Sequence, residues 1–202
     1  MQVSDANGRK ALRRYAVANG WMRSRAEMKP VDSEGNPLPW YTYPAIHFLE
    51  ERAKPEWTVF EFGCGHSTLW WARRVQEVFS VEHNHDWADM MAAKAPANAR
   101  IRFVELLPGG DYCRAAQMID RKFDVIVIDG EDRIRCMNNS LDKLAPGGVF
   151  VWDNAERGGL EAAFSRLARR GFKRLRLVGH GPMLGRTGDT SIFYKRRNCM
   201  GI

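Results

Sequence analysis

Residues 58–72, TVFEFGCGHSTLWWA, decide the fold. The β-rich run TVFEF (58–62) passes through Gly63 and Gly65 into an expected helix from Ser67 to Val75. Glycines let the backbone turn sharply and approach a ligand closely, and Ser67 can cap a helix whose first N–H groups are free. A strand, a glycine turn and a helix in this order are typical of a nucleotide site in an α/β sheet.

The composition is that of a globular protein with one main core. The chain has 202 residues, of which 45% are hydrophobic and 27% charged. No run approaches the ~18 apolar residues of a membrane span, so none is expected. The N-terminus has no apolar segment of the kind found in secretory signals. Four scattered cysteines without a CxxC pair predict neither a zinc site nor a disulfide framework, so the expected location is cytoplasmic.

Short β-rich runs alternate with helical segments from about residue 40 onward. The expected strands are 58–62, 77–83, 101–107, 123–130 and 147–154, and a helix follows each of them. This alternation predicts an α/β fold with a doubly wound, mostly parallel sheet and helices on both faces. Runs 173–179 and 191–196 have only a loop between them, so they should form a C-terminal antiparallel hairpin at the sheet edge.

The segment before this pattern, residues 1–36, is predicted to be a helical or irregular extension. A helix broken near Gly20 is expected there, and DSEGNP (32–37) is a turn cluster that marks the start of the main domain, 37–202. The extension could provide a homodimer contact or cover the active site.

Two glutamates discriminate between nucleotide ligands. Glu82 ends the second expected strand about 20 residues after Gly63, which suits a carboxylate that accepts both ribose hydroxyls. Glu61 precedes the glycine turn and would repel a pyrophosphate, whereas the ammonium and sulfonium of S-adenosylmethionine are cationic. Thr68 stands where a dinucleotide motif has its third glycine. The pattern favours S-adenosylmethionine over NAD, while Glu61 could also simply accept backbone hydrogen bonds and rigidify the turn.

The ordered motifs EFGCGHSTLWWA, SVEH, FDVIVIDG and LAPGGVFVWDN resemble those of the class I S-adenosylmethionine-dependent methyltransferases over residues 40–196. The resemblance implies a seven-stranded sheet with the terminal hairpin and the cofactor over the ends of the first, second and fourth strands. It assigns the glycine turn to the methionine end, Glu82 to the ribose, His83 to the adenine and Asp129 to the methyl group. The cofactor-binding residues so expected are Glu61, Gly63, Cys64, Gly65, Ser67, Thr68, Glu82, His83 and Asp129, with the loop Leu106–Asp111 beside the adenine.

The segment PLPWYTYPAIHFLEE (37–51) precedes the first strand. Trp40, Tyr41 and Tyr43 could stack over the sulfonium, a good cation–π target, so Tyr43 joins the expected cofactor-binding residues. Alternatively, the segment is an amphipathic helix that packs its aromatic side chains on the sheet.

A metal site is the next prediction. Asp129 follows the fourth strand and Asp153 with Asn154 follows the fifth, and carboxylate and amide oxygens suit Mg²⁺. The catechol-type O-methyltransferases are similar in this respect, although Gly130 and the lack of their N-terminal helical lid depart from them. In the alternative interpretation, Asp153 and Asn154 cap the next helix and Asp129 orients the cofactor or acts as a base.

The resulting functional prediction is methyl transfer to a small-molecule acceptor, with oxygen favoured and Asp129 and Asp153 as catalytic residues. Loops 153–159 and 179–189 are expected to hold the acceptor, and His180 is a further candidate base. The net charge of +7 admits an acidic acceptor or a solvated basic face around RRGFKRLRL (169–177). No Asn/Asp-Pro-Pro-aromatic motif favours nucleobase methylation, so a nucleic-acid partner is not expected. The competing hypotheses are a non-catalytic binding module that uses this basic face for nucleic acid or a protein, and an NAD-dependent oxidoreductase.

Overall fold

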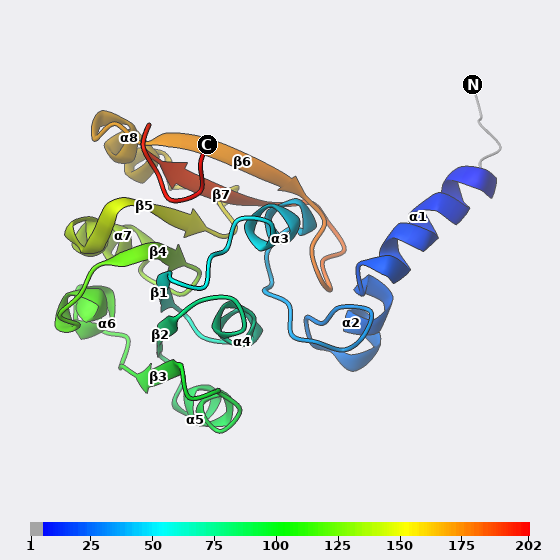
Figure 1. The fold of residues 1–202 in the computed structure, drawn as a ribbon, viewed down its shortest axis with the longest axis horizontal. Helices are drawn as coiled ribbons and strands as arrows, with labels where there is room; N and C mark the ends of the chain where they lie inside the picture. Colours follow the sequence, from blue (N-terminus) through cyan, green and yellow to red (C-terminus); the bar gives the residue numbers. More distant parts are fainter. Residues whose placement is uncertain (1–5) are drawn as a thin grey trace.

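The computed structural model describes residues 6–202 and contains a seven-stranded sheet in the order β3-β2-β1-β4-β5-β7-β6 (Figure 1). Strands β1 to β5 are parallel, whereas β7 runs antiparallel to both β5 and β6. The predicted class of sheet and its C-terminal hairpin are confirmed. The strands are β1 (Thr58–Phe62), β2 (Glu77–Glu82), β3 (Ala99–Phe103), β4 (Phe123–Ile128), β5 (Leu144–Trp152), β6 (Lys173–Gly179) and β7 (Gly188–Tyr194).

Helices cover both faces of the sheet, with α3, α4 and α5 on one side and α6, α7 and α8 on the other (Figure 1). Two short 3-10 helices, η1 (Ala115–Met118) and η2 (Leu141–Lys143), follow α6 and α7. The α-helices are α1 (Ala6–Ala18), α2 (Trp21–Glu27), α3 (Tyr43–Glu50), α4 (His66–Ala72), α5 (His85–Ala92), α6 (Asp111–Arg114), α7 (Arg133–Ser140) and α8 (Glu161–Arg169).

Strict alternation along the buried strands builds two different cores. Phe60, Phe62 and Trp152 point with the other sheet aromatics toward α6–α8. Val59, Val127 and their valine neighbours point toward α3 and α4. Successive side chains of a strand point to opposite faces, so Glu61 lies on the valine face, beneath α4. This placement determines which side chains can reach its carboxylate.

The N-terminal helices stand outside the sheet, and α1 projects from the body (Figure 1). The predicted break occurs at Gly20, which has a φ of 74° between α1 and α2. A Cβ at this position would lie 2.4 Å from the Val31 carbonyl oxygen, so glycine is required there. Residues 1–5 of the predicted extension lie outside the described residues. Among the helices that the structure describes, none is long and apolar enough to cross a membrane.

Several element boundaries differ from the sequence prediction. β3 begins at Ala99 and ends at Phe103, because its pairing follows β2 from Val78 to Glu82. β5 begins at Leu144, where its pairing with β4 shifts register between Phe123 and Val125. The N-cap of α5 is Asn84, whose side chain accepts a hydrogen bond from the Trp87 amide.

Candidate active site

The glycine turn lies where the carboxyl ends of β1 and β4 meet. Gly63 has a φ of 88°, and its amide donates a hydrogen bond to the Val81 carbonyl. A Cβ on Gly63 would lie 3.2 Å from Gly130, and a Cβ on Gly130 would lie 2.0 Å from the Tyr112 hydroxyl. Both glycines are therefore required by close packing of the turn. This explains the glycine that follows Asp129.

Glu61 is fully buried beneath the turn. Its Oε2 accepts hydrogen bonds from the hydroxyls of Thr68 at 2.5 Å and Ser80 at 2.9 Å, whereas its Oε1 has no partner in the described part of the chain. Burial raises the pKa of this carboxyl to about 7, against the effect of its hydroxyl donors. Glu61 thus ties α4 and β2 to β1 through side-chain hydroxyls, whereas the alternative interpretation of Glu61 had backbone N–H donors. An unpartnered buried oxygen is also suited to an ammonium donor.

Glu82 ends β2 and is only 6% exposed. Its Oε2 accepts from the Cys64 amide at 3.1 Å, and its Oε1 accepts from the amides of His83 and Asn84 at 2.8 and 2.9 Å. Three backbone donors therefore fix the carboxylate beside the turn. A carboxylate has about four lone-pair sites, so acceptor capacity remains for a ligand hydroxyl.

A polar cavity of about 460 Å³ opens over these strand ends. This volume falls within the usual range for small-molecule sites. Its lining residues come from the glycine turn, the ends of β2, β4 and β5, and the loops after β5 and β6; they include Gly63, Cys64, Ser67, Glu82, His83, Asp129, Gly130, Asp153 and Asn154. A neighbouring apolar cavity of about 410 Å³ shares Trp40, Cys64, Ser67, Trp87 and Asp129 with it.

Asp129 and Asp153 form an acidic pair in the polar cavity. Burial raises the pKa of Asp129 to about 7, although the Arg133 charge opposes the shift. The Asp129 side chain is 22% exposed, whereas Asp153 is 3% exposed. Burial and the Asp129 charge together raise the pKa of Asp153 well above its usual value. The pair therefore retains protons at a pH where ordinary aspartates are ionised.

The three predicted metal ligands, Asp129, Asp153 and Asn154, contact other side chains of the protein. The Asp153 Oδ1 accepts from the Thr190 hydroxyl at 2.6 Å, and its Oδ2 accepts from the Asn154 amide at 2.8 Å. The Asn154 Oδ1 accepts from Arg133 at 3.3 Å, and the same guanidinium donates to the carbonyls of Asp129 and Asp153. A fixed cation thus bridges the ends of β4 and β5. Among residues 6–202, no group of three or more His, Cys, Asp or Glu side chains could hold a metal.

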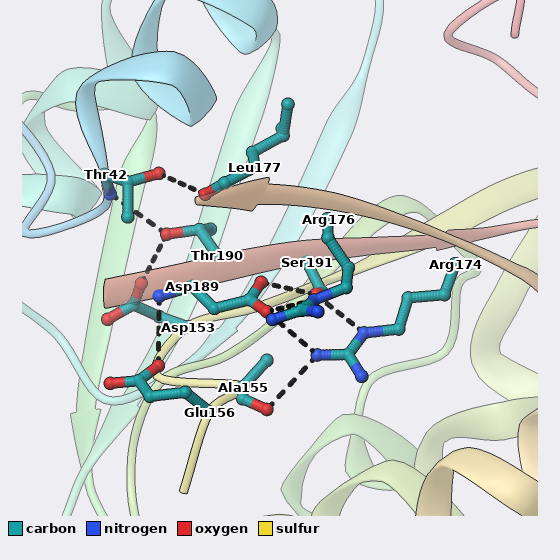
Figure 2. Close-up of polar contacts among 10 residues, drawn as sticks. All are labelled: Thr42, Asp153, Ala155, Glu156, Arg174, Arg176, Leu177, Asp189, Thr190 and Ser191. Carbon is teal, nitrogen blue, oxygen red and sulfur yellow. Dashed lines mark hydrogen bonds and ion pairs between the residues drawn. The ribbon is translucent and has the colours of Figure 1, made fainter. Parts of the chain in front are cut away.

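The hairpin β6–β7 contacts Asp153 through Thr190 (Figure 2). The Thr190 hydroxyl donates to Asp153 and accepts from the Thr42 amide at 3.0 Å. The Thr42 hydroxyl in turn donates to the Leu177 carbonyl at 2.7 Å. This chain of bonds joins Asp153, the segment before α3 and the hairpin into one network.

The predicted basic face is smaller than the sequence suggests. Arg174 and Arg176 both pair with the buried Asp189 at 3.2 and 2.7 Å (Figure 2). Arg174 also donates to the Ser191 hydroxyl and stacks over Phe164. Both arginines of this run are therefore paired within the hairpin, although the Arg176 side chain remains 58% exposed.

The structure brings most of the predicted site residues to the polar cavity, but not all of them. Glu61 and Thr68 lie beneath the glycine turn and do not line the cavity. Tyr43 is a core residue of α3 that lines a different pocket, and its ring packs edge-on against Tyr15. Trp40, which is 48% exposed, lines the polar cavity instead. Four predicted cofactor residues therefore do not line the polar cavity: Glu61, Thr68, Tyr43, and Gly65, which lines the neighbouring apolar cavity.

Other predicted residues also lie away from the polar cavity. The loop Leu106–Asp111 does not line it, and neither does His180, whose carbonyl accepts from the Tyr43 amide at 2.7 Å. Sequence analysis missed Trp87, Glu131 and Arg133, which do line it. The cavity is also lined by Arg157, Leu184 and Arg186, which lie in the two loops, 153–159 and 179–189, that were expected to hold the acceptor. Trp87 stands in the first turn after the Glu82 strand and donates to the Cys64 carbonyl at 2.7 Å. The position of Trp87 just after β2 was the sequence feature that could have indicated its place in the site.

Comparisons with known proteins agree with this geometry. Residues 60–155 match the family model described as a methyltransferase domain. A putative caffeoyl-CoA O-methyltransferase from Staphylococcus aureus is 15% identical with a TM-score of 0.61, and the match covers 95% of this chain and 100% of that one. A methyltransferase from Geobacter sulfurreducens is 18% identical with a TM-score of 0.54, over 89% of this chain and 88% of that one.

A methyltransferase-like protein from Silicibacter pomeroyi is 21% identical with a TM-score of 0.53, and the match covers 78% of this chain and 89% of that one. The comparison with curated proteins gave no match. At these identities the solved structures establish the fold alone. The family model adds a sequence match to a methyltransferase domain. The chain thus has the fold of the class I S-adenosylmethionine-dependent methyltransferases, and its residues 60–155 match a methyltransferase-domain model.

Proposed function

We propose that the protein transfers a methyl group from S-adenosylmethionine to an oxygen atom of a small-molecule acceptor. The observation that carries the proposal is one cavity of about 460 Å³ lined by the glycine turn, Glu82, Asp129 and Asp153. Cofactor-type residues and an acidic pair thereby face the same space. The proposal extends the methyltransferase fold to a specific reaction and a class of acceptor.

The residues around the turn fit the cofactor's chemistry. Glu82 would accept the ribose hydroxyls, and the turn Gly63–Ser67 would hold the methionine end. The unpartnered Glu61 Oε1 lies beneath that turn and suits the cofactor's ammonium. When bound, S-adenosylmethionine supplies an electrophilic methyl group on a cationic sulfur. The protein's own contribution is to position the acceptor and to exclude water from it.

Asp129 is the proposed general base. An oxygen acceptor must lose its proton during transfer, and a carboxylate with a pKa near 7 is matched to that task at neutral pH. Only the ionised form of Asp129 can accept the proton, so turnover should rise as the pH rises through about 7. Asp153, held by Thr190 and Asn154, places a second carboxyl in the same cavity.

The hydrogen bonds of Asp153 and Asn154 favour a metal-independent reaction, so no proposed step depends on a metal. Arg133 already supplies a positive charge between the ends of β4 and β5. Turnover should therefore survive treatment with a chelator. Loss of activity on chelation, with recovery on adding Mg²⁺, would contradict this assignment.

The non-catalytic alternative would use the basic residues of the run 169–177, two of which, Arg174 and Arg176, are paired with Asp189.

The test uses cofactor with a radiolabelled methyl group and a cell extract divided by ultrafiltration. The filtrate contains small molecules, and the retained fraction contains proteins and nucleic acids. We expect the wild-type protein to label products in the filtrate, and Asp129→Asn to label them much more slowly. Label found only in the retained fraction would contradict a small-molecule acceptor. No label in either fraction, from protein that binds S-adenosylhomocysteine, would contradict catalysis.

A further inference from the structure

Two arginines from the loops after β5 and β6 line the polar cavity. Arg157 lies in the loop after β5, and Arg186 lies in the loop between β6 and β7. Within residues 6–202, neither guanidinium has an ion pair or a side-chain hydrogen bond. Arg133 in the same cavity differs, because it is bonded to Asp129, Gly130, Asp153 and Asn154. The two loop arginines are therefore the cavity's available cations.

The acidic groups around them are of three kinds: hydrogen-bonded, raised in pKa by burial, or exposed to solvent. Glu156, next to Arg157, accepts a hydrogen bond from the Asp189 amide at 3.0 Å. Asp129 and Asp153 have raised pKa values caused first by burial, and the Arg157 charge acts to lower that of Asp129. Glu131 is exposed on the β4 side of the cavity. The positive charges of Arg157 and Arg186 are thus available to an anion in the cavity.

Both arginines sit beside glycines with open space around them. A Cβ on Gly158, Gly159 or Gly185 would meet nothing within 4 Å, and Gly159 has a φ of 84°. Such positions allow the two loops to change conformation at low steric cost. An anion shared by the two guanidiniums would draw the loops together over the cavity, because their like charges otherwise repel.

We propose that Arg157 and Arg186 bind an anionic group, a carboxylate or a phosphate, carried by the methyl acceptor. The guanidinium fork matches the planar geometry of carboxylate oxygens and also suits phosphate. This inference rests on the proposed function, since it names the acceptor's class. It also replaces the run 169–177 as the source of any preference for acidic ligands.

The cofactor's own carboxylate has the same chemistry and is the other source of an anion. The cofactor's methionine end is expected at Gly63–Ser67, whereas Arg157 and Arg186 come from loops beyond β5 and β6. The acceptor is therefore the favoured source. Separate titrations of the cofactor product and of free anions distinguish the two.

The test measures binding by calorimetry at constant ionic strength. The probes are inorganic phosphate, benzoate and its neutral counterpart benzamide, each titrated with and without S-adenosylhomocysteine. The variants are Arg157→Gln, Arg186→Gln and their combination. Arg169→Gln is the matched control, because it removes an exposed arginine of α8 that does not line the cavity.

We expect the wild-type protein to bind phosphate and to prefer benzoate over benzamide. The double variant should weaken both anions by at least about tenfold, or about 1.4 kcal/mol, while the control and the affinity for S-adenosylhomocysteine stay unchanged. Equal anion affinity in the wild-type and double-variant proteins, or no anion binding by the wild type, would overturn the proposal. A loss confined to S-adenosylhomocysteine would assign the arginines to the cofactor and also overturn it. If the anion results hold but S-adenosylhomocysteine does not bind, the proposed function fails and the anion site stands.

Discussion

Replacing Glu82 by glutamine tests the ribose assignment with the smallest change of shape. In the native protein, the carboxylate accepts three backbone hydrogen bonds, from Cys64, His83 and Asn84. The proposed cofactor adds two ribose hydroxyls as donors. The amide introduced by Glu82→Gln would keep the volume but would lose the charge and turn an NH₂ group toward a donor.

The expected magnitudes follow from charge-assisted hydrogen bonds. Each such bond is worth about 1.5–3 kcal/mol, so weakening both ribose contacts should cost more than about 1.4 kcal/mol, or more than tenfold in affinity. A 2′-deoxy analogue of S-adenosylhomocysteine should bind the wild type about tenfold more weakly than the ribose form. In Glu82→Gln this preference should largely disappear.

The assay is calorimetric titration of both ligands into wild type, Glu82→Gln and the control Glu77→Gln. Glu77 lies at the other end of β2 and pairs with Arg100 and Arg121 outside the cavity. A merely structural effect on the turn would weaken both ligands equally. An unchanged ratio of the two affinities in Glu82→Gln would therefore refute the ribose contact.

Three further predictions concern stability, each measured by urea unfolding. The folded pKa of Glu61 is raised from 4.5 to about 7, so the native state binds the extra proton in that window and its stability falls as pH rises. Glu61→Gln should lack this pH-dependent loss of stability, which is worth up to about 3 kcal/mol in the wild type. Parallel curves of unfolding free energy against pH for the wild type and the variant would contradict the burial argument. Asp189→Asn should lower the free energy of unfolding by about 2–3 kcal/mol, because it leaves Arg174 and Arg176 without their buried partner. If the losses from Asp189→Asn and Arg176→Gln simply add in the double variant, the pairing of these two residues is excluded. Gly130→Ala should lower the free energy of unfolding by about 1–3 kcal/mol, because the new Cβ would lie 2.0 Å from the Tyr112 hydroxyl. Adding Tyr112→Phe should recover part of that loss, and no recovery would assign the loss to the contact with the Gly63 backbone instead.

The sequence predicts the fold well where periodicity and chain order determine it. The bounds of β1 and β6 agree with their apolar patterns, and the missing helix between the last two strands correctly predicts an antiparallel hairpin. The strand ends that were predicted less accurately are determined by pairing between strands. β5 begins three residues early across Pro146 because its ladder with β4 shifts register, and no local pattern encodes that shift.

The residues of the candidate site were also predicted only in part. Glu82 and Asp129 were predicted because topology alone brings the ends of parallel strands to one edge of the sheet. Trp40 and Tyr43 were harder to separate, since a turn of the chain before α3 decides which ring faces the cavity.

Partners distant in the sequence were invisible to pattern analysis. Arg174 and Arg176 look like a free basic face until the hairpin register brings Asp189 to them across the strand pair. Arg157 and Arg186 lie on separate loops, and only the folded chain places them in one cavity. Loop conformation and tertiary pairing therefore carry the information that the sequence pattern lacks.

The measurement that tests the central claim most directly is a calorimetric titration of the full chain with S-adenosylhomocysteine, with NAD as the comparison. The account predicts micromolar binding of S-adenosylhomocysteine and no binding of NAD, because Glu61 and Thr68 disfavour a pyrophosphate at the glycine turn. Absence of S-adenosylhomocysteine binding, or equal binding of NAD, would contradict the assignment of this cavity to methyl transfer.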